Sequence, residues 1–179
     1  MSGTKYNADV PKFLLKLAVG PSLSPYVNLI SDDYIDSKFN PPLKALFKQV
    51  DTSGLQPNQY IAFTVDFGEG IQGRVGYAID GNGTVYELTG LGVGASVLPV
   101  SIGVTVGMPL KQEGYGYSKE EMRKIMEGVS VSFSFQGGTQ GGFGWSPASN
   151  VVTAEVGGAT NAGLGIMGAN THPLFNIND

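Results

Sequence analysis

Ser146, Glu155 and His172 follow one another in the order nucleophile, acid and base that α/β-hydrolases use. Ser146 lies in Gly144-Trp145-Ser146-Pro147-Ala148, which resembles a variant of the sharp turn that presents a nucleophilic serine. In that turn the backbone N–H of the residue after the serine stabilises the oxyanion, and Pro147 has no N–H. The segment is therefore predicted to be a simple turn, with no catalytic residue assigned.

Paired carboxylates are a second source of hydrolytic chemistry. Four of them fall near one predicted hairpin: Asp66, Glu69, Asp80 and Glu87. No spacing among them singles out a general acid and a nucleophile. A carboxylate-dependent hydrolase therefore stays an alternative, and the sequence favours a protein that is not an enzyme.

Two motifs suggest a cofactor or a metal, and each has a structural explanation. Gly90–Ala95 matches a loose dinucleotide-binding pattern, but a strand rather than the required helix is predicted next, so a glycine-rich bend is expected. Asp80–Thr84 begins like a calcium loop, but the same residues form a hairpin turn. The chain has no cysteine and one histidine, His172, so any metal site would need oxygen ligands. We expect no cofactor and no metal.

Aromatic residues in predicted loops are the candidate contacts to a membrane or a partner. Tyr115 and Tyr117 flank Gly116, while Phe143 and Trp145 lie among glycines before Pro147. An aromatic ring offers apolar area, and Tyr and Trp add a polar edge, which suits a membrane interface. The alternative is that each ring folds back onto the core.

Two segments alternate like strands but carry no charge on either face. In residues 97–109, apolar side chains alternate with Ser, Thr and Gly, and in residues 129–136 they alternate with Ser and Gln. The candidate inserting or assembly residues are Val100, Ile102, Val104, Val106, Val129, Val131, Phe133 and Phe135. Solvent-facing strands usually carry charged or long polar residues, so we expect the small-residue faces to avoid bulk water.

Composition supports a chain with few solvating groups. Charged residues make up 15% of the 179 residues, glycines number 27, and the net charge of −4 gives no support for a nucleic-acid partner. All eleven Lys and Arg lie before Gly128, and only Glu155 and Asp179 are charged after it. No signal peptide is visible, so any release would follow a non-classical route.

The pattern predicts an α+β protein with a predominantly antiparallel sheet, either a sandwich or a partial barrel. Residues 1–57 are expected to form a helical N-terminal segment packed on a β-rich, glycine-rich body of residues 58–179, in one domain overall. The segment has two short helices, 11–19 and one opened by Asn40-Pro41-Pro42, and a third helix follows near 118–127. Strands are expected at 61–67, 71–79, 84–88, 97–109, 129–136, 150–156 and 163–168, with a flexible loop at 137–144.

These observations favour a protein that engages a membrane or a partner surface. The alternation resembles the general pattern of β-pore formers, whose inserting strands alternate apolar residues with Ser, Thr and Gly. The expected partners are a lipid membrane, another protein or further copies of this chain in a homo-oligomer. The alternatives are a self-assembling structural subunit and a small-ligand-binding β barrel.

Overall fold

The computed structural model describes residues 12, 16, 28–29, 31–110 and 117–179. The chain divides into two compact units, Met1–Val50 and Asp51–Asp179. In the first unit, helix α3 spans Asp32–Phe47, and the Ser31 hydroxyl caps it by accepting a hydrogen bond from the Tyr34 N–H at 3.3 Å. The helix predicted at 11–19 lies outside the described residues, apart from Lys12 and Lys16.

The second predicted helix was placed too late in the chain. We expected it to begin at Asn40, because proline is common in the first turn of a helix. In the structure Pro41 and Pro42 lie inside α3, which begins nine positions earlier behind the Ser31 cap. The capping serine, not the proline pair, marks the start of this helix.

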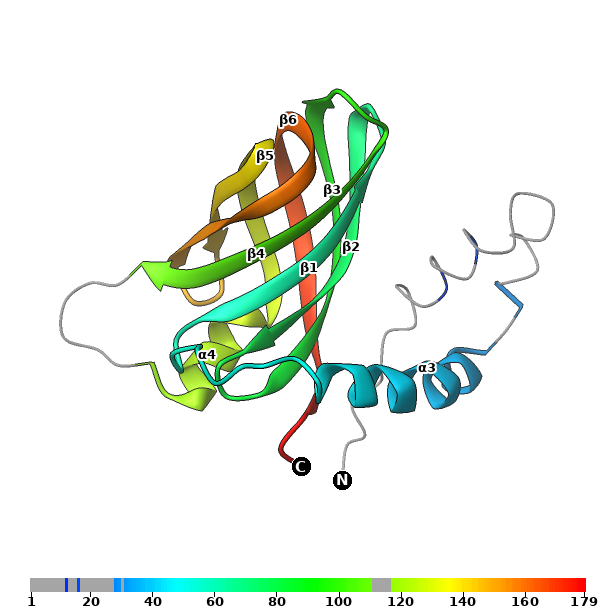
Figure 1. The fold of residues 1–179 in the computed structure, drawn as a ribbon, viewed down its shortest axis with the longest axis vertical. Helices are drawn as coiled ribbons and strands as arrows, with labels where there is room; N and C mark the ends of the chain where they lie inside the picture. The colour runs from blue at the N-terminus through cyan, green and yellow to red at the C-terminus, as the bar shows by residue number, and fades with distance from the viewer. Residues whose placement is uncertain (1–11, 13–15, 17–27, 30, 111–116) are drawn as a thin grey trace. The chain divides into compact units, whose positions relative to one another are not determined.

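The second unit is an antiparallel β barrel (Figure 1). Its elements are β1 (Tyr60–Phe67), β2 (Gly70–Asp80), β3 (Thr84–Ser96), β4 (Val100–Leu110), α4 (Lys119–Met126), β5 (Gly128–Ser146) and β6 (Val151–Asn176). Hydrogen bonding follows the order β3-β2-β1-β4-β6-β5, and β6 also pairs with β3. Five strands, β1, β2, β3, β4 and β6, therefore close into a ring, which decides between the sandwich and the partial barrel that the sequence allowed.

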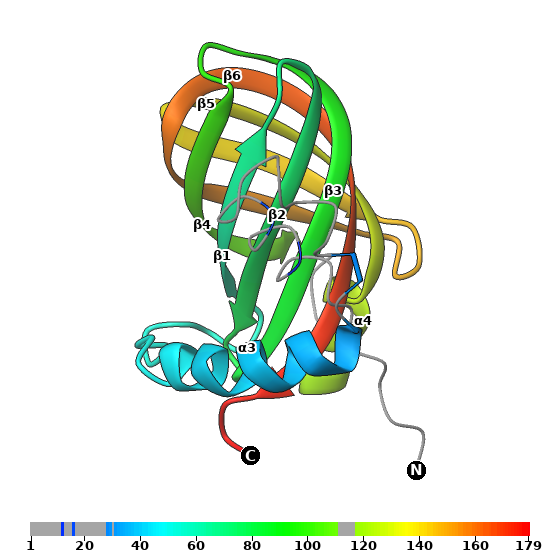
Figure 2. The same ribbon diagram turned by 90° about the vertical axis from the view of Figure 1, so that its right-hand side faces the viewer.

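Strand β6 closes the ring because its two halves pair with different neighbours (Figure 1, Figure 2). Its first half runs against β4, from Val152 opposite Leu110 to Ala159 opposite Gly103. Its second half runs against β3, from Gly163 onward. The sequence predicted two separate strands at 150–156 and 163–168, and the structure joins them into one.

Strand β5 follows β6 along its whole length and bends in the middle. The register shifts between Gly137 and Thr139, where Gly138 has a φ of 80° that only glycine adopts easily. The two halves then approach each other so closely that a Cβ on Gly142 would lie 2.5 Å from the Phe133 carbonyl oxygen. The prediction of a flexible loop at 137–144 is wrong, because these glycines form a bulge and allow a close backbone contact within β5.

The prediction for the glycines of β3 is wrong for the same reason, because they also lie within a strand. Residues 90–95 were expected to bend the chain, but they continue β3 as far as Ser96. A Cβ on Gly92 would lie 2.8 Å from the Met167 Cα on β6, so glycine is needed for close strand packing. The turns predicted at Asp80–Gly83 and at Ser146-Pro147 are confirmed, since β2 ends at Asp80 and β5 ends at Ser146.

Helix α4 covers one end of the barrel. Ser118 caps it in a capping box with Glu121, as predicted from the sequence. Met122 on its inner face is fully buried. Met122 packs in a cluster with Tyr60, Ala62, Ala78 and Tyr86, which is the apolar core of the barrel. In the described part of the chain, no helix has both the length and the apolar character needed to cross a bilayer.

Candidate functional site: outer face and interior of the barrel

Away from the apolar core beneath α4, the barrel has apolar side chains outside and polar or small side chains inside. In β4, Ile102 is 56% exposed, whereas its neighbour Ser101 and the next inward hydroxyl, Thr105, are each 3% exposed. The same alternation occurs in the first half of β5, where Val131 and Phe133 are exposed and Ser132 is half-buried. The expectation that the small-residue faces avoid bulk water holds, and the reason is that they line the barrel interior.

The exposed apolar residues form a surface that we call the outer belt. Their exposed fractions range from 37% to 76%. The belt comprises Ile71, Leu91, Val93, Val100, Ile102, Val104, Val106, Met108, Leu110, Val129, Val131, Phe133, Phe135, Phe143, Trp145, Val152, Val156, Leu164 and Ile166. It includes all eight candidate strand residues predicted from the sequence, together with Phe143 and Trp145.

Strand pairing makes the belt continuous. One row crosses four strands, because Ile71 lies opposite Val93, Val93 opposite Ile166, and Ile166 opposite Phe133. A second row joins Leu110, Val152 and Trp145 across β4, β6 and β5. The exposed apolar side chains are therefore neighbours across strands, and contiguous apolar patches are typical of interaction surfaces.

Charge is absent from the exposed part of the outer face. The six strands contain five charged residues: Asp66, Arg74, Asp80, Glu87 and Glu155. Asp66, Arg74, Asp80 and Glu155 point into the barrel, and Glu87 is buried at 2% exposure. Glu87 lies on the outer face between the core-facing Tyr86 and Leu88 but is covered there, so none of the six strands has an exposed charged side chain.

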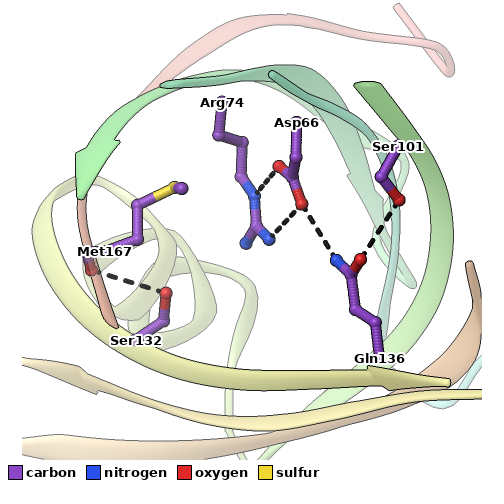
Figure 3. Close-up of polar contacts among 6 residues, drawn as sticks. All are labelled: Asp66, Arg74, Ser101, Ser132, Gln136 and Met167. Carbon is purple, nitrogen blue, oxygen red and sulfur yellow. Dashed lines mark hydrogen bonds and ion pairs between the residues drawn. The ribbon is translucent and has the colours of Figure 1, made fainter. Parts of the chain in front are cut away.

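Polar groups in the interior are held in a connected cluster (Figure 3). Arg74 donates from Nε and Nη2 to the two carboxylate oxygens of Asp66, at 2.6 and 2.8 Å. Gln136 donates to Asp66 at 3.0 Å, and its amide oxygen accepts from the Ser101 hydroxyl at 3.1 Å. Side chains from β1, β2, β4 and β5 are thereby joined across the lumen.

A second buried contact lies nearer to α4. The Tyr60 hydroxyl donates to a Glu155 carboxylate oxygen at 2.7 Å. Burial, together with the negative charge of Glu155, raises the pKa of Tyr60 well above its usual value. Burial alone would lower the pKa of Arg74, but the hydrogen bonds and charge of Asp66 outweigh it, so the pKa of Arg74 is raised. Arg74 therefore stays charged inside the barrel.

The two cavities that adjoin the interior polar groups are small. One cavity of about 20 Å³ adjoins Asp66, Ser101 and Gln136, and another of about 60 Å³ adjoins Arg74, Tyr60 and Glu155. Ligand pockets usually measure about 300–1,000 Å³, so these cavities suit a few water molecules rather than a small ligand. A larger groove of about 450 Å³ lies outside the lumen, between α4 and the β5–β6 turn, and Tyr117 lines it.

Catalytic residues considered from the sequence do not come together. Ser146 and Glu155 face the interior, whereas His172 lies on the opposite face of β6 beside Asn170, whose amide nitrogen is 2.9 Å from the His172 Nε2. Asp66 is paired with Arg74, while Asp80 lies at the other end of the β1–β2 pair, opposite Tyr60. Glu69 is exposed in the β1–β2 turn.

The aromatic candidates lie in different environments. Phe143 and Trp145 are in β5, not in a loop, and about half of each side chain is exposed. The Trp145 Nε1–H donates to the Asn150 side-chain oxygen at 3.3 Å. Tyr117 is partly buried just before α4, and Tyr115 lies outside the described residues. Among the described residues, no group of three or more His, Cys, Asp or Glu side chains is placed to hold a metal ion.

Sequence reasoning missed the interior cluster. Gln136 lies 70 residues after Asp66 in the sequence, and only the long-range pairing of the strands brings the two side chains together. One signal was available: Asp66 and Arg74 are the charged residues at inward positions of two adjacent predicted strands joined by a short turn. Such a pair is placed to meet across the hairpin.

No family model and no curated protein matches this sequence. Among solved structures, the chain shows a weak likeness to virulence-associated protein VapB from the intracellular pathogen Rhodococcus equi. The TM-score is 0.39 and the sequence identity is 12%, over 66% of this chain and 100% of that chain.

Proposed function

We propose that the barrel is a membrane-binding module whose outer belt lies in the hydrocarbon region of a lipid bilayer. The observation that carries this proposal is the alternation of apolar outward and polar inward side chains, with no exposed charge on any strand. Membrane barrels alternate in this direction, whereas a water-soluble barrel buries its apolar side chains.

The length of the belt supports a bilayer. Outward apolar residues recur at every second position of β4 from Val100 to Leu110. At about 3.3 Å per residue the segment extends about 33 Å, and a tilt of about 40° reduces its height to about 25 Å. The apolar band of a transmembrane barrel is about 25 Å tall.

Backbone pairing supports the same environment. Backbone N–H and C=O groups have no water to bind in hydrocarbon, so a sheet enters a bilayer only when it closes on itself. Here β6 closes a ring of five strands by pairing with both β3 and β4, while β5 pairs with β6 alone and its two halves approach each other at Gly142 and Phe133. The strand exchange between copies that a β-pore former would use is not needed, because both low-charge segments already pair within one chain.

A bilayer covers the belt better than a second copy does. Belt residues occur on β2, β3, β4, β5 and β6, around most of the ring. A two-fold dimer would cover the belt on one side only, whereas lipid surrounds a barrel. We therefore place the partner in the lipid and expect self-association in its absence.

The proposal does not include conduction, ligand transport or catalysis. The interior cavities of about 20 and 60 Å³ leave no room for a passing solute. The carboxylates of the hydrolase alternative are paired or separated, as described above. Binding through the outer face is what the arrangement supports.

Flotation of the protein with zwitterionic lipid vesicles tests the proposal. The protein is expected to float with the vesicles, and the emission of Trp145, the one tryptophan in the chain, is expected to shift to shorter wavelength. A lysine at the middle of the belt costs about 2–4 kcal/mol in a membrane barrel, so Val104→Lys, near the centre of β4, should lower partitioning about 30-fold or more.

The matched control is Leu46→Lys. Leu46 is also an exposed apolar residue, at 59%, but it belongs to α3 in the other unit. Both variants must show the wild-type circular dichroism spectrum. If the wild-type protein stays out of the lipid fraction, or if the two variants lower flotation equally, the proposal is wrong.

A further inference from the structure

We propose that the barrel enters the bilayer with the end that carries the β3–β4 turn, and that the α4 end stays in the water on the side of approach. This proposal rests on the proposed function. It adds a direction to membrane binding and assigns a role to turns that carry a single charged residue, which the outer belt alone does not.

Two turns and two strand bends gather at the entering end (Figure 1). Phe67 pairs with Val100, Gly70 with Gly94, Ser96 with Gly163, and Gly163 with Gln136, so the β1–β2 turn, the β3–β4 turn and the bends of β5 and β6 meet there. These segments are residues 67–71, 95–100, 135–139 and 160–164. Glu69 is their single charged residue. Little charge would have to cross the hydrocarbon.

The β3–β4 turn presents apolar side chains at this end. Val97 and Leu98 are exposed at 74% and 47%, and Pro99 follows them. The side-chain amide of Asn161 holds the turn with two hydrogen bonds. Its oxygen accepts from the Leu98 N–H at 3.0 Å, and its nitrogen donates to the Leu98 carbonyl oxygen at 2.8 Å. Asn161 itself is buried. The turn is thus a fixed apolar tip, and its backbone groups at Leu98 are satisfied without water.

The opposite end carries the charge. Helix α4 and its C-cap contain six ionisable residues: Lys119, Glu120, Glu121, Arg123, Lys124 and Glu127. The chain enters the barrel at Tyr60 and leaves it at Asn176, and both residues lie at this end, opposite Asp80 and Thr84 respectively. Everything attached to the barrel by the chain can therefore remain in water while these short turns and bends cross.

The position of Trp145, at the α4 side of the outer belt, agrees with this direction of entry. It lies opposite Val152, which pairs with Leu110 at the last position of β4, on the α4 side of the belt. Tryptophan collects at the boundary between hydrocarbon and water, where its ring is buried and its N–H is satisfied. The Nε1–H of Trp145 already has Asn150 as its acceptor.

Site-directed labelling of the full chain tests the direction, and the absence of native cysteine makes each label unique. The variants Leu98→Cys and Lys124→Cys carry the dye NBD, and dithionite, which does not cross the bilayer, is added outside preformed vesicles of zwitterionic lipid. The Lys124 label is expected to be reduced at once, and the Leu98 label to be protected until detergent is added. Val97→Cys repeats the measurement at the tip if the Leu98 variant misfolds.

The outcomes separate the two proposals. Flotation of the labelled protein with both labels reduced at once would show adsorption without entry, which overturns the direction and leaves the outer belt as the lipid-binding surface. Protection of the Lys124 label instead of the Leu98 label would show the reverse direction and also overturn it. Absence of flotation would remove both proposals.

Discussion

Arg74 is the single cation in the six strands, and the interior of the barrel is organised around it. Its side chain is 7% exposed, and its guanidinium group makes two hydrogen bonds to Asp66, which also accepts one from Gln136. A charge buried in this way is tolerated because its partner is present, and the cost of burial reappears if the partner is removed. The pair joins the β1–β2 hairpin on its inner side.

Breaking this pair should destabilise the barrel strongly. Arg74→Met leaves the Asp66 carboxylate buried without its cation, so the free energy of unfolding should fall by about 3–5 kcal/mol, measured by urea denaturation. The double variant Asp66→Leu with Arg74→Met removes both charges and should recover most of that loss. A single variant as stable as the wild type would show that the interior admits enough water to solvate Asp66.

Asp80 gives a pH dependence of defined sign. Its carboxylate accepts hydrogen bonds from the Asn82 and Thr84 N–H groups and from the Tyr86 hydroxyl, but burial outweighs them and raises the pKa of Asp80. The folded protein therefore holds this proton more tightly than the unfolded chain does. Its contribution to stability is present below the ordinary aspartate pKa and is lost as the pH rises through the raised pKa.

The variant Asp80→Asn should remove that dependence. The asparagine oxygen can still accept from the turn amides, so the hairpin is kept while the buried charge is lost. Thermal unfolding at a series of acidic to neutral pH values should show that the wild type loses stability relative to the variant as the pH rises. A wild type that gains on the variant over the same range would show that the hydrogen bonds outweigh burial.

At the level of elements, local sequence patterns predicted most strands and the capping box. The roles of the glycines depend on contacts between residues far apart in the sequence. The alternation in 97–109 and 129–136 and the hairpin signal at Asp80–Gly83 come from neighbours in the sequence, so they could be predicted. The role of a glycine depends on the strand that approaches it: Gly92 and Gly142 permit close backbone contact, and the sequence alone could not distinguish this from a loop. Local alternation also pointed to the outer belt residues of β4 and the first half of β5, whereas those of β2, β3 and β6 and the interior cluster depend on long-range pairing and were not predicted.

Helix α4 is the element that supplies an apolar core to an otherwise polar interior. Met122→Ala should lower the free energy of unfolding by about 2–5 kcal/mol, because it leaves a cavity among Tyr60, Ala78 and Tyr86. The control Lys124→Ala, on the exposed face of the same helix, should change it by less than about 0.5 kcal/mol. Equal effects of the two variants in urea denaturation would mean that α4 does not cap the barrel.

At the scale of the whole molecule, the small size of the interior cavities separates membrane binding from membrane permeation. Vesicles loaded with a self-quenching dye should retain it at protein concentrations that give complete flotation, because the cluster around Arg74 and Asp66 spans the lumen. Dye release at those concentrations would show that the strands rearrange on lipid into a wider barrel. Light scattering after size exclusion should show association in buffer and one chain per micelle in mild detergent.

The double pairing of β6 also constrains how the protein can be made. Strands β3 and β4 share this one neighbour, and it is synthesised after both of them. Until its residues leave the ribosome, the nascent chain has two open sheet edges flanked by apolar side chains, a state prone to aggregation. A holding chaperone that delays collapse until synthesis ends would therefore protect this chain, and a stop codon before Val151 should yield an insoluble product.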